Sequence, residues 1–245
     1  MQERTHHPSG PLGIAIALAA AAGFVDAYIY VNVTPVFVAN MSGNLIHMGI
    51  FFGDGDWKPA VAVLLALGAF TAGVIVATVH HDRQVTRSRA VHPAFLLAIE
   101  SVLLVGLTTW LVAAPTAFTT RPRAADFPVL VIGALAMGIQ AGALRRVGEI
   151  AVATTYGTGA IVRIGEKLVL AARRADRSST HRRRVAIAVL VVVLVSYVAG
   201  AVVATVAGSS PWLLGVPTVV LIGCAIISGG TRLAETETET SPAST

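Results

Sequence analysis

The stretch 36-VFVANMSGNLIHMG-49 decides the fold, because its polar residues Asn40, Ser42 and Asn44 interrupt sequence that is otherwise apolar. A second stretch, 151-AVATTYGTGAIVRIG-165, has a similar mixture of small, hydroxyl-bearing and glycine residues. Both stretches lie among long apolar runs. We therefore expect each half of the chain to carry one polar segment, and the two segments to face each other near the middle of a membrane.

The composition is that of an integral membrane protein. Hydrophobic residues make up 55% and charged residues 13% of the 245 positions, and the mean hydropathy is +0.74. A soluble domain of this size uses less apolar sequence. The net charge of +5 comes from short arginine-rich connectors, which is typical of a topology signal. The lipid bilayer is therefore the expected partner, and nucleic acid is not. Cys224 is the single cysteine, so no intramolecular disulfide can form.

Apolar runs predict an all-α, polytopic helix bundle with about six transmembrane helices and two re-entrant or broken segments. A helix rises about 1.5 Å per residue, and the hydrocarbon core is about 30 Å thick. Runs of suitable length and hydropathy cover 11–31, 60–79, 94–113, 127–144, 185–207 and 212–228. The predicted organisation is a cytoplasmic tail (1–12), a first membrane repeat (13–113), a connector (114–126), a second membrane repeat (127–230) and a disordered tail (231–245).

The two halves resemble each other in sequence. The segments 72-AGVIVATV-79 and 199-AGAVVATV-206 are identical at six of eight positions, and 23-GFVDA-27 aligns loosely with 138-GIQAG-142. Gly73 and Gly200, within these matching segments, predict close packing of helices. With three crossings in each half, the second half is upside down relative to the first. The sequence thus predicts two inverted repeats, a design common in transporters.

The arginine distribution favours six crossings over eight. Outside the two polar segments, six crossings place thirteen Lys and Arg residues on the cytoplasmic side and three outside, whereas eight crossings give eleven and five. Cytoplasmic loops carry the excess of Lys and Arg. Both termini are therefore predicted to be cytoplasmic.

Three blocks resemble the YoaK-type family of bacterial inner-membrane proteins, a domain of unknown function (number 1275). They are 23-GFVDA-27, 36-VFVANMSGN-44 and 153-ATTYGTG-159, and the resemblance covers about residues 12–230. It implies a multi-pass protein of the bacterial plasma (inner) membrane and supplies no activity. Where such proteins often carry a Gln-Asn pair, this chain has Gln140 followed by Ala141.

The candidate site residues are polar groups within the predicted spans and polar segments. Carboxylates inside a membrane usually face the bundle interior, although Asp26 could also reach water at the end of its helix. No HExxH or GxSxG pattern is present, so we predict no enzyme, no catalytic residues, no metal site and no cofactor. The candidates for substrate binding are Asp26, Asn40, Ser42, Asn44, Glu100, Gln140, Thr154, Thr155, Tyr156 and Thr158.

These residues predict a small-solute transporter or channel-like permease with a site at the midplane between the inverted repeats. Half-helices starting at 42–44 and 158–159 would direct unpaired N–H groups and positive dipole ends at the solute, which favours a neutral polar or anionic molecule. Asp26 and Glu100 could carry a coupling proton or cation. The alternative is a non-transporting membrane scaffold or partner subunit. The oligomeric state stays open.

Overall fold

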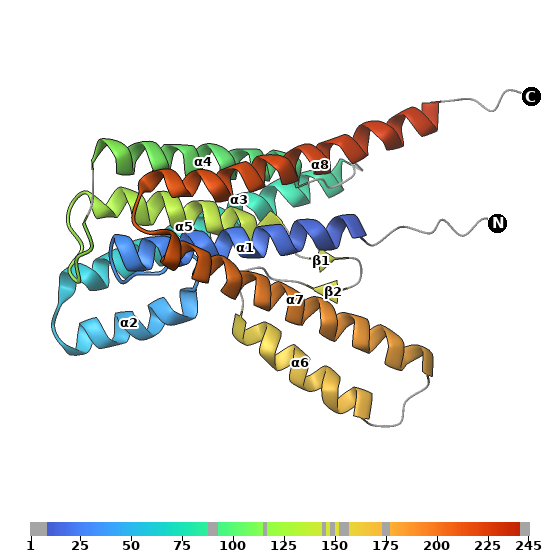
Figure 1. Ribbon diagram of the computed structural model, residues 1–245, viewed down its shortest axis with the longest axis horizontal. Coiled ribbons are helices and arrows are strands. Elements are labelled where there is room, and N and C mark those ends of the chain that lie inside the picture. Colours follow the sequence, from blue (N-terminus) through green and yellow to red (C-terminus); the bar gives the residue numbers. More distant parts are fainter. Residues whose placement is uncertain are drawn as a thin grey trace, which may run out of the picture.

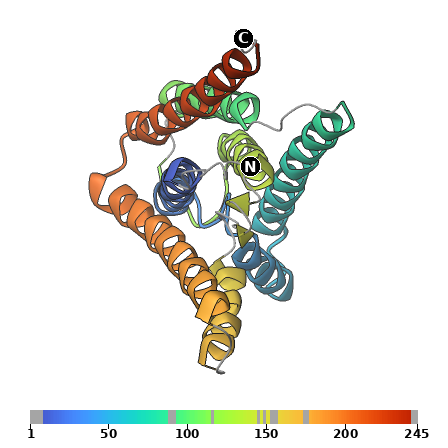
Figure 2. The same cartoon turned by 90° about the vertical axis from the view of Figure 1, so that its right-hand side faces the viewer.

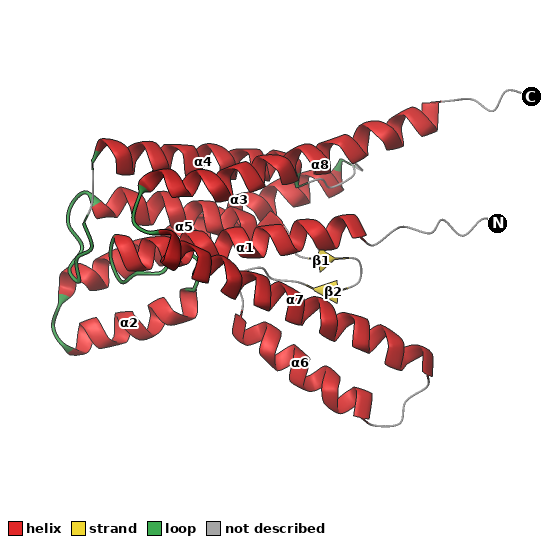
Figure 3. Ribbon diagram, viewed as in Figure 1, coloured by secondary structure: helices red, strands yellow, loops and turns green. Residues whose placement is uncertain are grey.

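The computed structural model consists almost wholly of helices (Figures 1 and 3). It describes residues 9–87, 93–114, 117–143, 146–147, 150–151, 157–172 and 177–240. In these residues the α-helices are α1 (Ser9–Asn32), α2 (Met41–Gly53), α3 (Trp57–Thr86), α4 (Ala94–Ala113), α5 (Asp126–Ala143), α6 (Gly157–Ala172), α7 (Arg177–Ala207) and α8 (Gly215–Thr240). A 3-10 turn, η1 (Pro211–Leu214), precedes α8, and strands β1 (Arg146–Val147) and β2 (Ile150–Ala151) form a small antiparallel hairpin.

The six predicted spans are confirmed as helices long and apolar enough to cross a membrane. Within the described part of the chain, these spans cover Leu12–Asn32, Trp57–Thr86, Ala94–Ala113, Asp126–Ala143, Arg183–Ala207 and Pro211–Gly229. The two polar segments instead lead into short helices, since α2 has 13 residues and α6 has 16. At about 1.5 Å per residue, neither helix is long enough to cross a core of about 30 Å.

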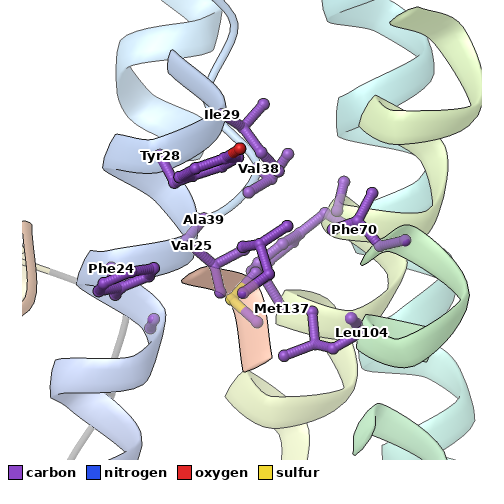
Figure 4. Close-up of a cluster of buried hydrophobic side chains, with 14 of the residues drawn as sticks. Phe24, Val25, Tyr28, Ile29, Val38, Ala39, Phe70, Leu104 and Met137 are labelled. Carbon is purple, nitrogen blue, oxygen red and sulfur yellow. The ribbon is translucent and has the colours of Figure 1, made fainter. Parts of the chain in front are cut away.

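Viewed end-on, the bundle has a central pair of helices with other helices on every side (Figure 2). Helices α1 and α5 form the centre, α3 and α7 flank them, α4 and α8 cover one side, and α2 and α6 lie on the opposite side. The main contacts of α1 are with α7 and α8, and those of α5 are with α3 and α4. Val25, Val38 and Met137 are among the buried side chains that fill the interior between these helices (Figure 4).

Glycines allow two of the helix pairs to approach backbone to backbone. A Cβ atom added to Gly23 in α1 would overlap the carbonyl oxygen of Tyr197 in α7, and one added to Gly200 would overlap that of Ala20. The α3–α5 pair has the same arrangement, with Gly138 against the Phe70 carbonyl and Gly73 against the Leu135 carbonyl. The prediction that Gly73 and Gly200 pack helices closely is confirmed.

Helix α8 continues well past the predicted end of the second membrane repeat. It runs to Thr240, past the boundary predicted at residue 230, and the disorder of residues 231–245 stays a prediction. The stretch 231-TRLAETETET-240 contains no glycine or proline to stop a helix, and the next proline is Pro242.

Candidate functional site

Helices α2 and α6 start close together and run in opposite directions (Figure 1). Their N-terminal ends face each other near the middle of the bundle's length, and each helix leads toward a different end of the molecule. Helix α2 packs against α3, and α6 packs against α7. The helices begin at Met41 and Gly157, within one residue of the starts predicted from sequence at 42 and 158. We call α2 and α6 the half-helices.

Asp26 holds the irregular segment that leads from α1 into the first half-helix. Its Oδ1 accepts hydrogen bonds from the main-chain N–H groups of Val38, at 2.6 Å, and Ala39, at 2.8 Å. Its Oδ2 accepts a hydrogen bond from the hydroxyl of Tyr197 on α7, at 2.6 Å. The side chain does not reach water at a helix end, because Asp26 is only 2% exposed. One carboxyl group thus ties together α1, α7 and the segment before α2.

Asn44, in the first turns of α2, completes the anchoring of this segment. Its Oδ1 accepts a hydrogen bond from the N–H group of Phe37 at 2.9 Å, and its Nδ2 donates one to the Phe37 carbonyl at 2.7 Å. Consequently the consecutive N–H groups of residues 37, 38 and 39 all bind side-chain oxygens. Irregular backbone at membrane depth requires such partners, since each unpaired group there costs several kcal/mol.

Asn40 caps the N-terminus of α2. Its Oδ1 accepts a hydrogen bond from the Gly43 N–H group, at 3.3 Å, and one from the Ser42 hydroxyl, at 2.9 Å. Asparagine is among the preferred residues at this position, because its oxygen satisfies a helix-end donor. Asn40 is half-buried and Ser42 is exposed, so both lie at the surface of the helix end that faces α6.

Three rings pack beside this helix end. Tyr30 stacks on Phe37 with a centroid distance of 4.3 Å, and the His47 ring lies nearly parallel to Phe37 at 5.8 Å. Tyr30 and Phe37 belong to α1 and to the segment before α2, while His47 belongs to α2 itself. The stack therefore gives the start of α2 a second, apolar attachment to α1.

The structure does not bring all the candidate residues together. Gln140 is buried at the centre of the bundle, where its Nε2 donates a hydrogen bond to the Leu18 carbonyl at 2.8 Å and links α5 to α1. Glu100 lies on α4, on the side of the bundle opposite the half-helices (Figure 2). Residues 154–156, which include Thr154, Thr155 and Tyr156, are outside the described residues, as is the side chain of Thr158.

Sequence reasoning missed Tyr197 as a partner of Asp26. The two residues are 171 positions apart, and each lies in a largely apolar run. The only available signal was the repeat itself, because Tyr197 lies three residues before Gly200 as Phe70 lies three before Gly73. At this position the α1–α7 pair has the Tyr197 hydroxyl, and the α3–α5 pair has the ring of Phe70 without one.

The fold defines a multi-pass α-helical membrane protein with two short helices that start near the middle of the bundle's length. The chain belongs to the family described as "Protein of unknown function (DUF1275)", whose model matches residues 14–227. It is 26% identical over 208 residues to the UPF0700 transmembrane protein YoaK of Bacillus subtilis (strain 168), which covers 84% of this chain and 88% of the relative. No solved structure matches the chain. The resemblance seen in the sequence is confirmed.

Proposed function

We propose that this protein is a small-solute transporter or channel-like permease whose pathway passes the facing ends of the two half-helices. The observation that carries the proposal is the placement of α2 and α6, whose N-termini meet near the middle of the bundle's length. Transporters of several folds bind their substrates at such interrupted helices near the midplane. At the start of α2 the N–H groups of Met41, Gly43 and Asn44 already bond to residues 39 and 40, so the solute would meet a capped helix end and its positive dipole.

The chemistry of a helix N-terminus indicates the class of solute. The first N–H groups of each helix point along its axis, and the helix dipole places about half a positive charge at that end. Two such ends favour a neutral polar or anionic solute. Asn40 and the exposed Ser42 hydroxyl would contact it from α2, and Thr154, Thr155, Tyr156 and Thr158 would do so from the other half. Asp26 and Asn44 would position the site, because their polar atoms bind the protein itself.

The packing of the helices supports a pathway between inverted repeats. If α1 to α4 correspond to α5 to α8, the α1–α7 contact corresponds to the α5–α3 contact, and α1–α8 corresponds to α5–α4. The α2–α3 contact corresponds to α6–α7 in the same way. Matching helices also run in opposite directions, as α1 and α5 do in Figure 1. This exchange of partners is what a two-fold axis in the membrane plane would produce.

Basic residues support a cytoplasmic position for one end of the bundle. The end of α3, with Arg83 and Arg87, lies at the same end of the molecule as the start of α7, with Arg183 and Arg184 (Figure 1). The start of α1 and the end of α8 lie there too. Since Lys and Arg are enriched in cytoplasmic loops, we place this end, and both termini, on the cytoplasmic side of the bacterial inner membrane.

A second candidate function is a non-transporting scaffold or partner subunit. The observation that favours it is that Asp26 and Asn44 both bind groups of the protein itself, Asp26 the Tyr197 hydroxyl and Asn44 the Phe37 backbone. Hydrogen bonds of this kind also hold membrane helices together. In a scaffold, the facing helix ends would bind no solute.

Flux measurements with the purified protein in liposomes separate the two functions. A panel of small neutral polar and anionic solutes is expected to give saturable flux for at least one member. Ser42→Trp, at the facing end of α2, is expected to reduce that flux at least tenfold by blocking the pathway. Ile50→Trp is the matched control, because Ile50 is also exposed on α2 but lies two turns further from that end. Absence of saturable flux across the panel would favour the scaffold. Equal flux in the two variants would show that the pathway does not pass the start of α2.

A further inference from the structure

Glu100 is another buried carboxyl group in the membrane part, and its surroundings differ from those of Asp26. It lies on α4, which packs against α5 and α8 on the side of the bundle away from the half-helices (Figure 2). Its side chain is fully buried, at 0% exposed. Neither Oε1 nor Oε2 has a hydrogen-bond partner, whereas both oxygens of Asp26 have one or more.

The residues around Glu100 offer it no charge of opposite sign. On α4, one turn away on either side, are the buried residues Leu96 and Leu104. The Ser101 hydroxyl next to it donates to the carbonyl of Leu97. On the helices packed against α4, the titratable groups with described side chains are the buried Cys224 thiol on α8 and Asp126 at the start of α5, and neither is a cation. On α3, the His80 ring stacks on Phe95, five residues before Glu100 on α4. The last turns of α8 carry Arg232, Glu235, Glu237 and Glu239, at least eight residues beyond Cys224, and their side chains lie outside the described residues.

An ionised carboxylate without a donor is the least favourable state of this group. Moving an isolated ion into apolar surroundings costs far more than moving the neutral acid, so the group takes up a proton instead. A bound metal cation would need several oxygen ligands. Within the described part of the chain, no three His, Cys, Asp or Glu side chains gather in a way that could hold a metal ion. The site therefore fits a proton.

We propose that Glu100 is a proton-binding site within the membrane. The carboxyl holds its proton while α4 and α8 pack as in this structure. When the contact between these helices opens to water, the O–H bond breaks, the proton passes to water and the carboxylate remains. Reprotonation restores the packed state. This site does not rest on the proposed solute pathway, because Glu100 lies across the bundle from α2 and α6.

Infrared spectroscopy of the purified protein in lipid tests the proposal directly. At neutral pH the C=O stretch of a protonated carboxyl group is expected in the wild-type spectrum and is expected to be lost in Glu100→Gln. Glu166→Gln is the matched control, because it makes the same change at an exposed position on α6 and should leave the band in place. A band that is unchanged in Glu100→Gln would show that Glu100 is ionised and would overturn the proposal.

Thermal unfolding gives a second, independent readout. In the folded protein the buried carboxyl of Glu100 makes no hydrogen bond, so it contributes a desolvation cost and no compensating bond. An apolar side chain of similar size avoids that cost, so Glu100→Met is expected to raise the Tm by about 2–4 °C. A lower Tm would mean that the carboxyl makes a stabilising contact, which would contradict the proposal. Neither experiment measures solute flux. The proton site can therefore be confirmed or overturned independently of the proposed transport function.

Discussion

The two glycine crossings of this bundle share their geometry and differ in their chemistry. In the α1–α7 crossing, Gly23 faces the carbonyl of Tyr197, and in the α3–α5 crossing, Gly138 faces the carbonyl of Phe70. Three residues after these glycines the chain has Asp26 in one crossing and Ala141 in the other. The first crossing therefore has a carboxyl–hydroxyl hydrogen bond where the second has a methyl group and a phenyl ring.

The comparison distinguishes the backbone contacts that hold the helices together from the hydrogen bonds that position the candidate site. Backbone contact between helices needs only small residues, and both crossings have them. The hydrogen bond between Asp26 and Tyr197 belongs to a larger set that also includes the N–H groups of Val38 and Ala39. The polar residues of the first crossing thus serve the segment ahead of α2.

The largest effect is expected from Asp26→Ala. Removing the carboxyl group would leave the buried N–H groups of Val38 and Ala39 without acceptors, and each such group costs about 1–3 kcal/mol. We expect a loss of about 2–6 kcal/mol in the free energy of unfolding, measured by denaturation in detergent. Asp54→Ala, at the exposed end of α2, should change stability by less than about 0.5 kcal/mol. Equal effects of the two substitutions would show that Asp26 does not anchor the segment.

A smaller effect, equal in the two crossings, is expected from substitutions at the glycines. Gly200→Ala and Gly138→Ala each place a Cβ atom against a backbone carbonyl, and the forced separation of helices should cost about 1–3 kcal/mol. At Gly68 and Gly223, within helices, an added Cβ would have no atom within 4 Å outside the adjoining backbone of its own helix, so Gly68→Ala and Gly223→Ala should stabilise by up to about 1 kcal/mol. If Gly200→Ala destabilises and Gly138→Ala does not, the crossings are not equivalent in packing.

The sequence predicted the helices well and the partners of polar side chains poorly. Hydropathy and length located the spans because both are properties of contiguous residues. The interior position of Asp26 followed from the cost of exposing a carboxylate to lipid. The cost of exposing a carboxylate does not identify the helix that the carboxylate faces. The hydrogen bond from Tyr197 to Asp26, and the position of Glu100 away from the half-helices, could therefore not be predicted. Both depend on how α7 and α4 pack around the central pair.

The small hairpin of β1 and β2 was not predicted either. Its two-residue strands are too short to produce an alternating pattern of apolar and polar residues. The continuation of α8 to Thr240 was not predicted for a different reason. The stretch is rich in charged and hydroxyl side chains and has no apolar run, although it contains no helix breaker.

The most direct test of the account is whether the half-helices cross the membrane, and cysteine labelling at the end of α3 answers it. In a Cys224→Ala background, Thr86→Cys places the only thiol at an exposed position at the end of α3. If α2 does not cross, an impermeant reagent should leave intact cells unlabelled and react only once the cytoplasmic face is opened. Asp54→Cys, after α2, should be labelled in intact cells. Labelling of Thr86→Cys in intact cells, with Asp54→Cys protected, would mean that α2 spans the membrane and would contradict the account.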